Sequence, residues 1–224
     1  HSRDGTIKYL FRLDDGATIE AVFIPEERRR TLCFSTQAGC PLKCAFCLTG
    51  IAGYKRNLKP WEILGQVAAL MAEAPADRPG EAPRAWNIVV MGMGEPLLNY
   101  DATVAALRIL LDPDGFAIPA KKLTLSTVGI LPALEKLMLE PVRPNLAISL
   151  HAPSAELRRE LMPIEEKYAI EDVIAAARRY PIPRGGVVTY EYVLLRGVND
   201  SKAHARELRR LLAGGRAKVN LIPL

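Results

Sequence analysis

Residues 35–50 read STQAGCPLKCAFCLTG and place three cysteines, Cys40, Cys44 and Cys47, within eight positions. The fourth cysteine of the chain, Cys33, lies just upstream in the apolar run TLCFS. Thiols so close together cannot staple a chain of 224 residues, so the sequence offers no disulfide framework. Clustered thiols in a long chain are more often metal ligands or redox groups, which favours a reducing, cytoplasmic setting.

The cysteine spacing is compatible with two kinds of metal site. Cys-x-x-x-Cys-x-x-Cys can wrap three thiolates around one cubic [4Fe-4S] cluster and leave one iron without a protein ligand. An open coordination position is typical of catalysis. The alternative is a closed zinc site made by all four cysteines in a non-catalytic RNA-binding module. The cysteines alone leave both interpretations open.

Short β-branched runs alternate with segments of helical period on both sides of the cysteine stretch. Residues 6–26 predict a hairpin that turns at Asp14-Asp15-Gly16. This order predicts an α/β fold: a partial (βα)6 TIM-type barrel (residues 31–224) with an N-terminal β-hairpin extension (residues 1–30). An open doubly wound sheet is the alternative, and the Pro-rich stretch 73–85 is expected to be a surface loop. Six buried strands are expected at 31–36, 86–92, 122–127, 145–151, 187–195 and 218–224, with helices at 60–74, 100–112, 132–139, 170–180 and 200–215.

Polar residues recur just after the expected strands. The carboxyl ends of parallel strands meet at one rim, which is where such folds place their sites. Glycine lets the backbone approach a ligand closely, and Glu95 can hold a positively charged amino group. Each residue alone is more commonly explained by turn chemistry, but their convergence with the cysteine stretch indicates a site. They are Gly92, Gly94, Glu95, Ser126, Thr127, Ser149 and His151.

The charge of the chain permits a nucleic-acid partner without requiring one. Thirty Lys and Arg residues against 25 Asp and Glu residues give a formal net charge of +5. Apolar runs are shorter than the roughly 18 residues of a membrane span, so no membrane association is expected. Lys55, Arg56 and Lys59 follow the cysteine stretch and are candidates for phosphate contacts. Plain surface charge is expected from Arg158, Arg159, Arg178, Arg179, Arg206, Arg209 and Arg210.

Several runs spread over nearly the whole chain carry a family resemblance. They are CxxxCxFCxTGxxGxxRNL at 40–58, VVMGMGEPLLN, LTLSTVG, AISLHAP, YVLLRGVND and VNLIP. Together they resemble the radical S-adenosylmethionine enzymes and, more narrowly, the RlmN/Cfr family of ribosomal RNA adenine methyltransferases.

The resemblance implies two cofactors and a set of residues that hold them. A [4Fe-4S] cluster on Cys40, Cys44 and Cys47 would bind S-adenosylmethionine through its free iron and cleave it to a 5′-deoxyadenosyl radical. Positions matching the family's S-adenosylmethionine contacts are Gly94, Glu95, Ser126, Ser149, Leu150 and His151.

The resemblance also implies an activity and partners. The family methylates adenine at C2, or at C8 in the Cfr type, through a methyl-cysteine intermediate. The implied catalytic residues are Glu20 as proton acceptor and Cys33 in resolving the protein–RNA adduct, and a disulfide bond is implied as well. The implied partners are 23S ribosomal RNA, transfer RNA in some members, and an electron donor such as flavodoxin or ferredoxin, with the enzyme a monomer.

The family's methyl-carrying cysteine and a further cofactor-contacting asparagine would lie beyond Leu224, and its N-terminal accessory domain would precede His1. We therefore expect this chain to bind cluster and cofactor without completing methyl transfer.

Overall fold

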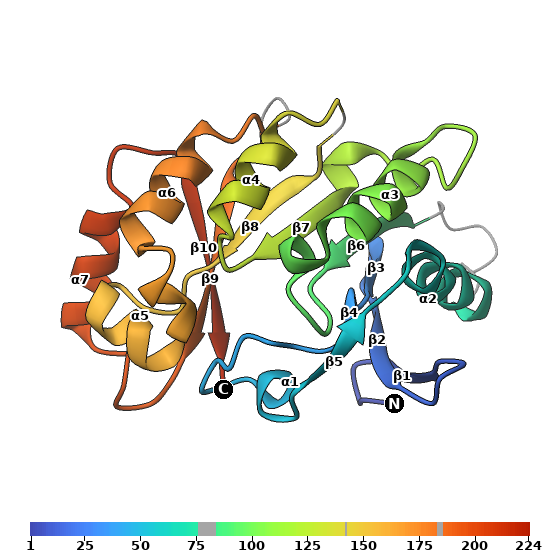
Figure 1. The fold of residues 1–224 in the computed structure, drawn as a ribbon, viewed down its shortest axis with the longest axis horizontal. Helices are drawn as coiled ribbons and strands as arrows, with labels where there is room; N and C mark the ends of the chain where they lie inside the picture. The colour runs from blue at the N-terminus through green and yellow to red at the C-terminus, as the bar shows by residue number, and fades with distance from the viewer. Residues whose placement is uncertain (76–83, 142, 183–185) are drawn as a thin grey trace.

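The computed structural model describes residues 1–75, 84–141, 143–182 and 186–224. Most of the loop expected at 73–85 lies outside the described residues. An eight-stranded sheet forms the centre of the fold in the order β1-β2-β3-β6-β7-β8-β9-β10 (Figure 1). The strands of this sheet are β1 (Ile7–Arg12), β2 (Thr18–Pro25), β3 (Arg29–Cys33), β6 (Ala85–Val90), β7 (Leu123–Thr127), β8 (Asn145–Ser149), β9 (Val188–Leu194) and β10 (Ala217–Pro223).

The first two strands form the expected hairpin. Their antiparallel register runs from Ile7 opposite Phe23 to Arg12 opposite Thr18, and Gly16 in the turn has a φ of 80° that favours glycine. Side chains of β2 alternate between buried and less buried, as expected of a strand with one face in the core. Strand β2 also pairs antiparallel with β3, so the hairpin is continuous with the main sheet.

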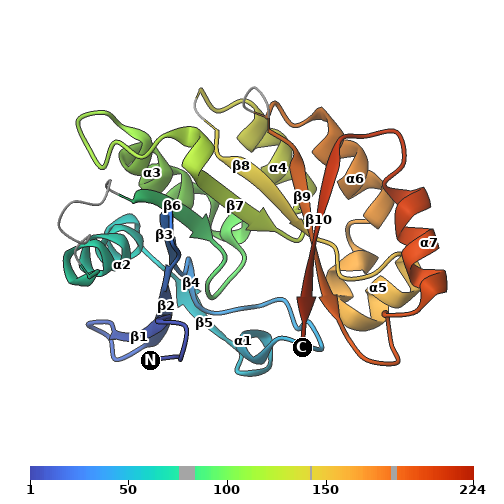
Figure 2. The same ribbon diagram turned by 180° about the vertical axis from the view of Figure 1, so that it is seen from behind.

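Six parallel strands, β3 and β6 to β10, follow one another in chain order. A doubly wound sheet reverses its strand order at a switch point, so that alternative is wrong. Constant progression in one direction puts the connecting helices on one face. Figure 1 shows them in front of the sheet and Figure 2 behind it. The expected helices are α2 (Pro60–Glu73), α3 (Tyr100–Leu111), α4 (Leu131–Met138), α6 (Ile170–Arg179) and α7 (Lys202–Leu211).

The structure adds elements that the sequence pattern did not predict. Strands β4 (Gln37–Gly39) and β5 (Tyr54–Asn57) pair as a two-stranded sheet on either side of the cysteine stretch, with the short helix α1 (Leu48–Ile51) between them. Helix α5 (Ala155–Leu161) follows β8, and 3-10 turns η1 (Pro96–Asn99), η2 (Ala120–Lys122) and η3 (Pro163–Glu166) complete the fold.

One expected buried strand is exposed. Strand β10 pairs with β9 along one side only, and six of its seven residues are exposed because it is an edge of the sheet. The expectation of six buried strands is therefore wrong for β10. Among the helices that the structure describes, none is both long enough and apolar enough to cross a bilayer.

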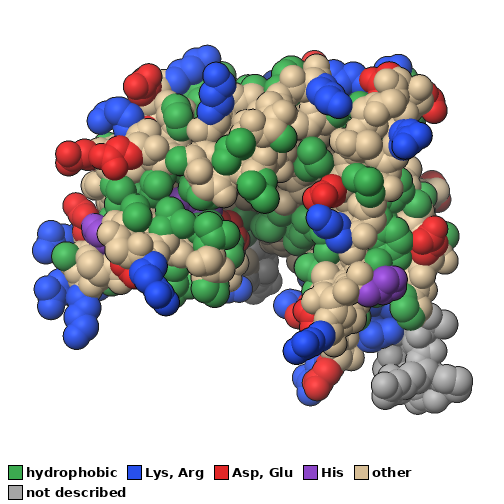
Figure 3. Space-filling view, turned by 90° about the horizontal axis from the view of Figure 1, so that it is seen from below, with side chains coloured by type: hydrophobic (Ala, Val, Ile, Leu, Met, Phe, Trp, Pro, Cys, Tyr) green, Lys and Arg blue, Asp and Glu red, His purple; other side chains and the backbone are tan. Residues whose placement is uncertain are grey.

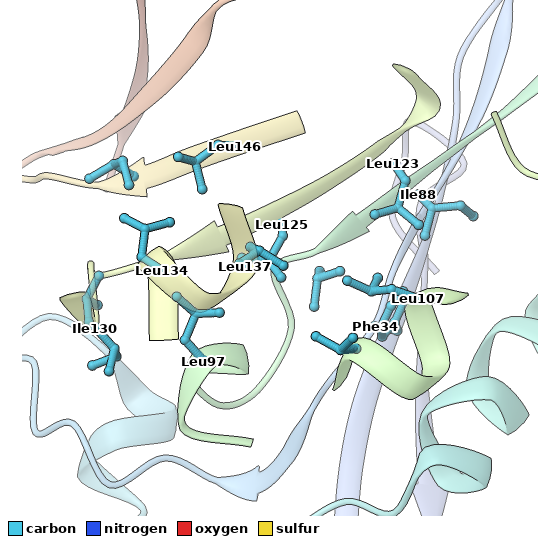
Figure 4. Packing of buried hydrophobic residues seen from close by; sticks show 14 of the residues in the cluster. Phe34, Ile88, Leu97, Leu107, Leu123, Leu125, Ile130, Leu134, Leu137 and Leu146 are labelled. Atoms are coloured by element: carbon cyan, nitrogen blue, oxygen red, sulfur yellow. The ribbon is translucent and has the colours of Figure 1, made fainter. Parts of the chain in front are cut away.

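The core lies between the sheet and its helices. Leu123 and Leu125 of β7 and Leu146 of β8 are fully buried. Figure 4 shows Leu123 beside Ile88 of β6, whereas Leu125 lies beside Leu137 and Leu146 lies near Leu134 of α4. Burying each such side chain contributes on the order of 1.5–3 kcal/mol, so Leu125 and Leu146 hold α4 against the sheet.

Truncation of Leu125 tests this core. Leu125→Ala should lower the free energy of unfolding by about 2–5 kcal/mol, because it leaves a cavity beneath α4. Leu139 is 84% exposed, and Leu139→Ala should change that free energy by no more than about 0.5 kcal/mol. Urea unfolding followed by circular dichroism measures both, and equal effects would contradict the packing.

Candidate active site

A pocket of about 230 Å³ lies at the carboxyl ends of the parallel strands. Figure 3 views the molecule from below and shows a hollow with hydrophobic side chains around it. The pocket joins residues far apart in the sequence, from the cysteine stretch to β10. Its lining consists of Cys40, Leu42, Cys44, Phe46, Cys47, Val90, Met91, Gly92, Gly94, Glu95, Ser126, Val128, Ser149, His151, Met162, Glu191 and Ile222.

The three closely spaced thiols all face this pocket. Cys40 and Cys44 are buried, whereas Cys47 is partly exposed at the start of α1. Burial raises the pKa of the Cys40 thiol to about 11 and that of Cys44 to about 12. Neighbouring thiols contribute in the same direction, so the three sulfurs interact electrostatically. With pKa values this high, Cys40 and Cys44 stay protonated until a metal displaces the protons.

Buried polar groups hold the cysteine stretch in place. The side chain of Gln66 on α2 exchanges two hydrogen bonds with the backbone of Ser35, at 2.9 and 3.0 Å. Asn99 donates to the carbonyls of Thr36 and Leu58, both at 2.8 Å. Gly39, just before the first ligand candidate, has a φ of 82°, and a Cβ there would collide with backbone. The stretch is therefore fixed by the fold.

Glu95 lines the pocket, and three donors fix its carboxylate. The Thr127 hydroxyl donates to Oε1 at 2.7 Å, and the backbone N–H groups of Leu97 and Val128 donate to Oε1 and Oε2 at 3.0 and 2.9 Å. Burial outweighs these hydrogen bonds and raises the pKa of Glu95 to about 7. A cationic ligand would offset that burial, as expected for a group that holds an ammonium.

His151 is held as a neutral acceptor. Its Nδ1 accepts a hydrogen bond of 3.1 Å from the backbone N–H of Val193, and burial lowers the pKa of His151 to about 3. The ring packs edge-on against Phe46 of the cysteine stretch, with centroids 4.8 Å apart. Asn199, from the RGVND run, donates to the His151 carbonyl at 2.8 Å. A residue of that run therefore helps to fix the backbone of His151, which lines the pocket.

Of the other expected cofactor contacts, three line the pocket and one does not. Gly94, Ser126 and Ser149 line the pocket, and the two hydroxyls lie 3.4 Å apart. Leu150 does not line it, because its side chain is fully buried in the core. Its backbone N–H donates to the carbonyl of Glu191.

Glu191 on β9 is a pocket residue that the sequence pattern missed. Burial raises the pKa of its carboxyl, and Oε2 accepts a hydrogen bond of 2.6 Å from Asn220. Among the described residues, Oε1 has no partner, so this oxygen is available to a ligand. Nothing local could have revealed it, since YEYV reads as an ordinary strand.

Cys33 and Glu20 are not among the residues that line the pocket. Cys33 ends β3, and burial raises its pKa to about 11. Glu20 on β2 forms an ion pair of 2.9 Å with Lys8, and its side chain is 43% exposed. All four cysteines are free thiols, so the expected disulfide bond is wrong for this structure.

The arrangement of sulfurs bears on the two metal hypotheses. A four-cysteine zinc site needs Cys33, which is not among the residues that line the pocket of the other three sulfurs. Among the residues that the structure describes, no three His, Cys, Asp or Glu side chains could hold a single ion. A cubic cluster places each thiolate on a different iron, so its ligands need not converge on one point. The three pocket thiols therefore fit the cluster.

Two basic groups differ from expectation. Arg56 is engaged by Glu62 at 2.8 Å and by Asp15 at 2.5 Å, which removes it as a free phosphate contact. Arg158 was expected at the surface, but its side chain is 0% exposed and paired with Glu165 at 2.5 Å. Local sequence could not show this, because its neighbour Arg159 is exposed as expected.

Comparison with known proteins identifies the family of this chain. The model of the radical SAM superfamily matches residues 34–208, which include every cysteine of the pocket. The chain belongs to the radical SAM superfamily. A crystal structure of a radical SAM methyltransferase from Sphaerobacter thermophilus has a TM-score of 0.92 and 47% identity over 100% of this chain and 65% of that one. Radical SAM enzymes of this type use a [4Fe-4S] cluster and S-adenosylmethionine.

Two curated relatives share the name "Dual-specificity RNA methyltransferase RlmN". The protein from Syntrophobacter fumaroxidans is 51% identical over 98% of this chain, and that from Syntrophotalea carbinolica is 50% identical over 99%. The chain spans 63% and 57% of their respective lengths. The similarity therefore covers nearly all of this chain but only part of each relative.

The metal assignment predicts different outcomes for two cysteine variants. Anaerobically reconstituted protein should hold about four iron and four sulfide per chain. Cys44→Ala should lose the cluster, whereas Cys33→Ala should keep it because all three pocket thiols remain. Iron and sulfide analysis with absorption spectra measures this. Equal loss in both variants, or stoichiometric zinc in place of iron, would contradict the assignment.

The raised pKa of Glu95 predicts pH-dependent cofactor affinity. Below about pH 7 its carboxyl is protonated in the free protein and cannot pair with an ammonium. Affinity for S-adenosylmethionine should therefore fall as the pH decreases below 7, by up to about tenfold per unit. Calorimetric titrations of the reconstituted protein should show this dependence, and Glu95→Gln should bind weakly at every pH. An unchanged pH dependence in Glu95→Gln would remove Glu95 from that role.

Proposed function

We propose that this chain is the catalytic core of a radical S-adenosylmethionine methyltransferase that acts on C2 of an adenine in 23S ribosomal RNA, with transfer RNA as a second substrate. The observation that carries the proposal is one pocket containing three free thiols, a buried carboxylate and paired serine hydroxyls. The names of the similar proteins support RNA as the substrate class.

In this proposal the pocket residues divide the work of holding the cofactors. Cys40, Cys44 and Cys47 hold the cluster, which supplies the electron for reductive cleavage of the sulfonium when bound. Glu95 pairs with the cofactor's amino group, and the Glu191 carboxylate accepts a hydrogen bond from its ribose. Adenine C2 is not nucleophilic, so it cannot take a methyl group by polar displacement, and a radical route avoids that obstacle.

Glu20 and Cys33 are proposed to serve the later steps as proton acceptor and adduct-resolving thiol, after transfer through a methyl-cysteine. The register of the strands supports a shared location for Glu20 and Cys33. Val22 pairs with Cys33, and Cys33 pairs with Val89, two residues before Met91 of the pocket lining. Side chains two apart on a strand share a face, so Glu20 and Cys33 lie on the sheet face that carries the pocket.

The remaining features of the proposal concern architecture and partners. Six parallel strands in chain order support a partial TIM-type barrel, with residues 1–30 as its hairpin extension. Free thiols support a reducing cytoplasm. The proposed partners are RNA and an electron donor such as flavodoxin or ferredoxin, with the enzyme acting as a monomer.

Product analysis tests the proposed reaction. The full-length protein, reconstituted anaerobically and given S-adenosylmethionine, a reductant and 23S ribosomal RNA, should release 5′-deoxyadenosine and produce 2-methyladenosine. Mass spectrometry of RNA digests identifies the base. Methylation at C8 would replace the proposal with the Cfr-type reaction, and absence of both products with intact cluster would overturn methyl transfer to RNA.

A further inference from the structure

A buried arginine lies directly behind the pocket wall. Arg158 on α5 is 0% exposed. One guanidinium nitrogen, Nη2, donates to the carbonyl of Val128 at 2.8 Å and to that of Ser149 at 3.5 Å. Both acceptors line the pocket, at the ends of β7 and β8. The guanidinium therefore joins two neighbouring strand ends at the point where the cofactor would bind.

The carboxylate that balances the charge of Arg158 belongs to Glu165. Nη1 donates to Oε2 of Glu165 at 2.5 Å, while Oε1 of Glu165 accepts from the backbone N–H of Ile170 at the start of α6. The charge of Arg158 acts on two pocket groups. It lowers the pKa of Cys44, which burial raises. It also lowers the pKa of His151, in the same direction as burial. The guanidinium contacts two residues that line the pocket, whereas Glu165 does not line it, so the positive end of the pair is the one nearer the pocket.

The same segment also contacts the cysteine stretch. The backbone N–H of Ala45, next to Cys44, donates to the carbonyl of Leu161 at 2.9 Å. Met162, the next residue, lines the pocket and donates its N–H to the carbonyl of Arg158. The helix that carries Arg158 thus supports one thiol-bearing loop and two strand ends together.

Stability alone is a weak reason for this buried charge. Removing two charges from water costs several kcal/mol, and apolar replacements of buried pairs are often neutral. Nε of Arg158 lacks a hydrogen-bond partner among the described residues, which adds to the cost. A fixed cation beside a redox centre has a direct electrostatic effect, because it favours the more negative, reduced form.

We propose that Arg158 is a positioning residue of the pocket: it fixes the Val128 and Ser149 carbonyls and places a permanent positive charge behind the cysteine loop that raises the reduction potential of the bound cluster. This inference rests on the proposed cluster site. Glu165 orients the guanidinium and partly offsets its charge.

Charge variants test the proposal by the sign of their effects. Arg158→Gln should lower the midpoint potential of the cluster, whereas Glu165→Gln, which leaves the cation uncompensated, should raise it. The double variant Arg158→Gln/Glu165→Gln should remain folded, because neither charge is left alone. Its potential should be lower than that of the parent protein, because the nearer charge dominates. Redox titration followed by electron paramagnetic resonance gives the potentials.

Arg159→Gln is the matched control, since it removes an exposed charge one residue away on the same helix. It should leave the potential unchanged. Shifts of Arg158→Gln and Glu165→Gln in the same direction, or a shift in Arg159→Gln equal to that of Arg158→Gln, would overturn the proposal. Iron analysis accompanies each titration. Loss of iron in the parent protein itself would overturn the cluster assignment, whereas intact clusters with unshifted potentials would overturn only the role of Arg158.

Discussion

The need to satisfy buried backbone groups in an irregular segment determines how this site is built. Residues 35–47 leave the end of β3 and cross the sheet rim largely without regular structure, although Ser35, Thr36 and Gln37 are almost completely buried. An unpaired buried N–H or C=O costs free energy comparable to a lost hydrogen bond. Side chains of Gln66 and Asn99, from α2 and the end of η1, supply the missing partners. The loop is consequently positioned by the sheet and its helices before any ligand contributes.

Burial in this pocket disfavours the deprotonated forms of its acidic groups, and a cationic ligand can offset that effect. Burial raises the pKa of Cys40 and Cys44, and it also raises the pKa of Glu95 and Glu191. All these groups are neutral when protonated and anionic when not, so burial opposes accumulated negative charge. Iron ions and the ammonium and sulfonium groups of S-adenosylmethionine are cations, and they would stabilise the deprotonated forms. The chemistry of the pocket therefore selects for positive ligands, consistent with membership of the radical SAM superfamily.

Local sequence predicts the parts of this structure that local forces decide. Hydrophobic runs located the six parallel strands, and the rim rule brought Glu95, Ser126 and His151 to the cysteines because parallel strands share their carboxyl end. Burial of individual polar groups depends on distant contacts and was not predictable. The run AELRREL contains Arg158 and Arg159 side by side, one buried and one exposed, and only packing against the pocket distinguishes them. Glu191 was missed for the same reason.

The unit after β8 explains how fold and site are coupled. Strands β7 and β9 lead to α4 and α7 with no element between them, but after β8 the elements α5 and η3 intervene before α6. This additional segment lies at the rim, where it contacts the cysteine stretch through Ala45 and Leu161 and the strand ends through Arg158. A hydrogen-bonded cation can transmit both position and charge to the pocket without touching a ligand. Residues of α5 can therefore tune the site while the thiols themselves remain unchanged, which separates control of the reaction from the groups that bind its cofactors.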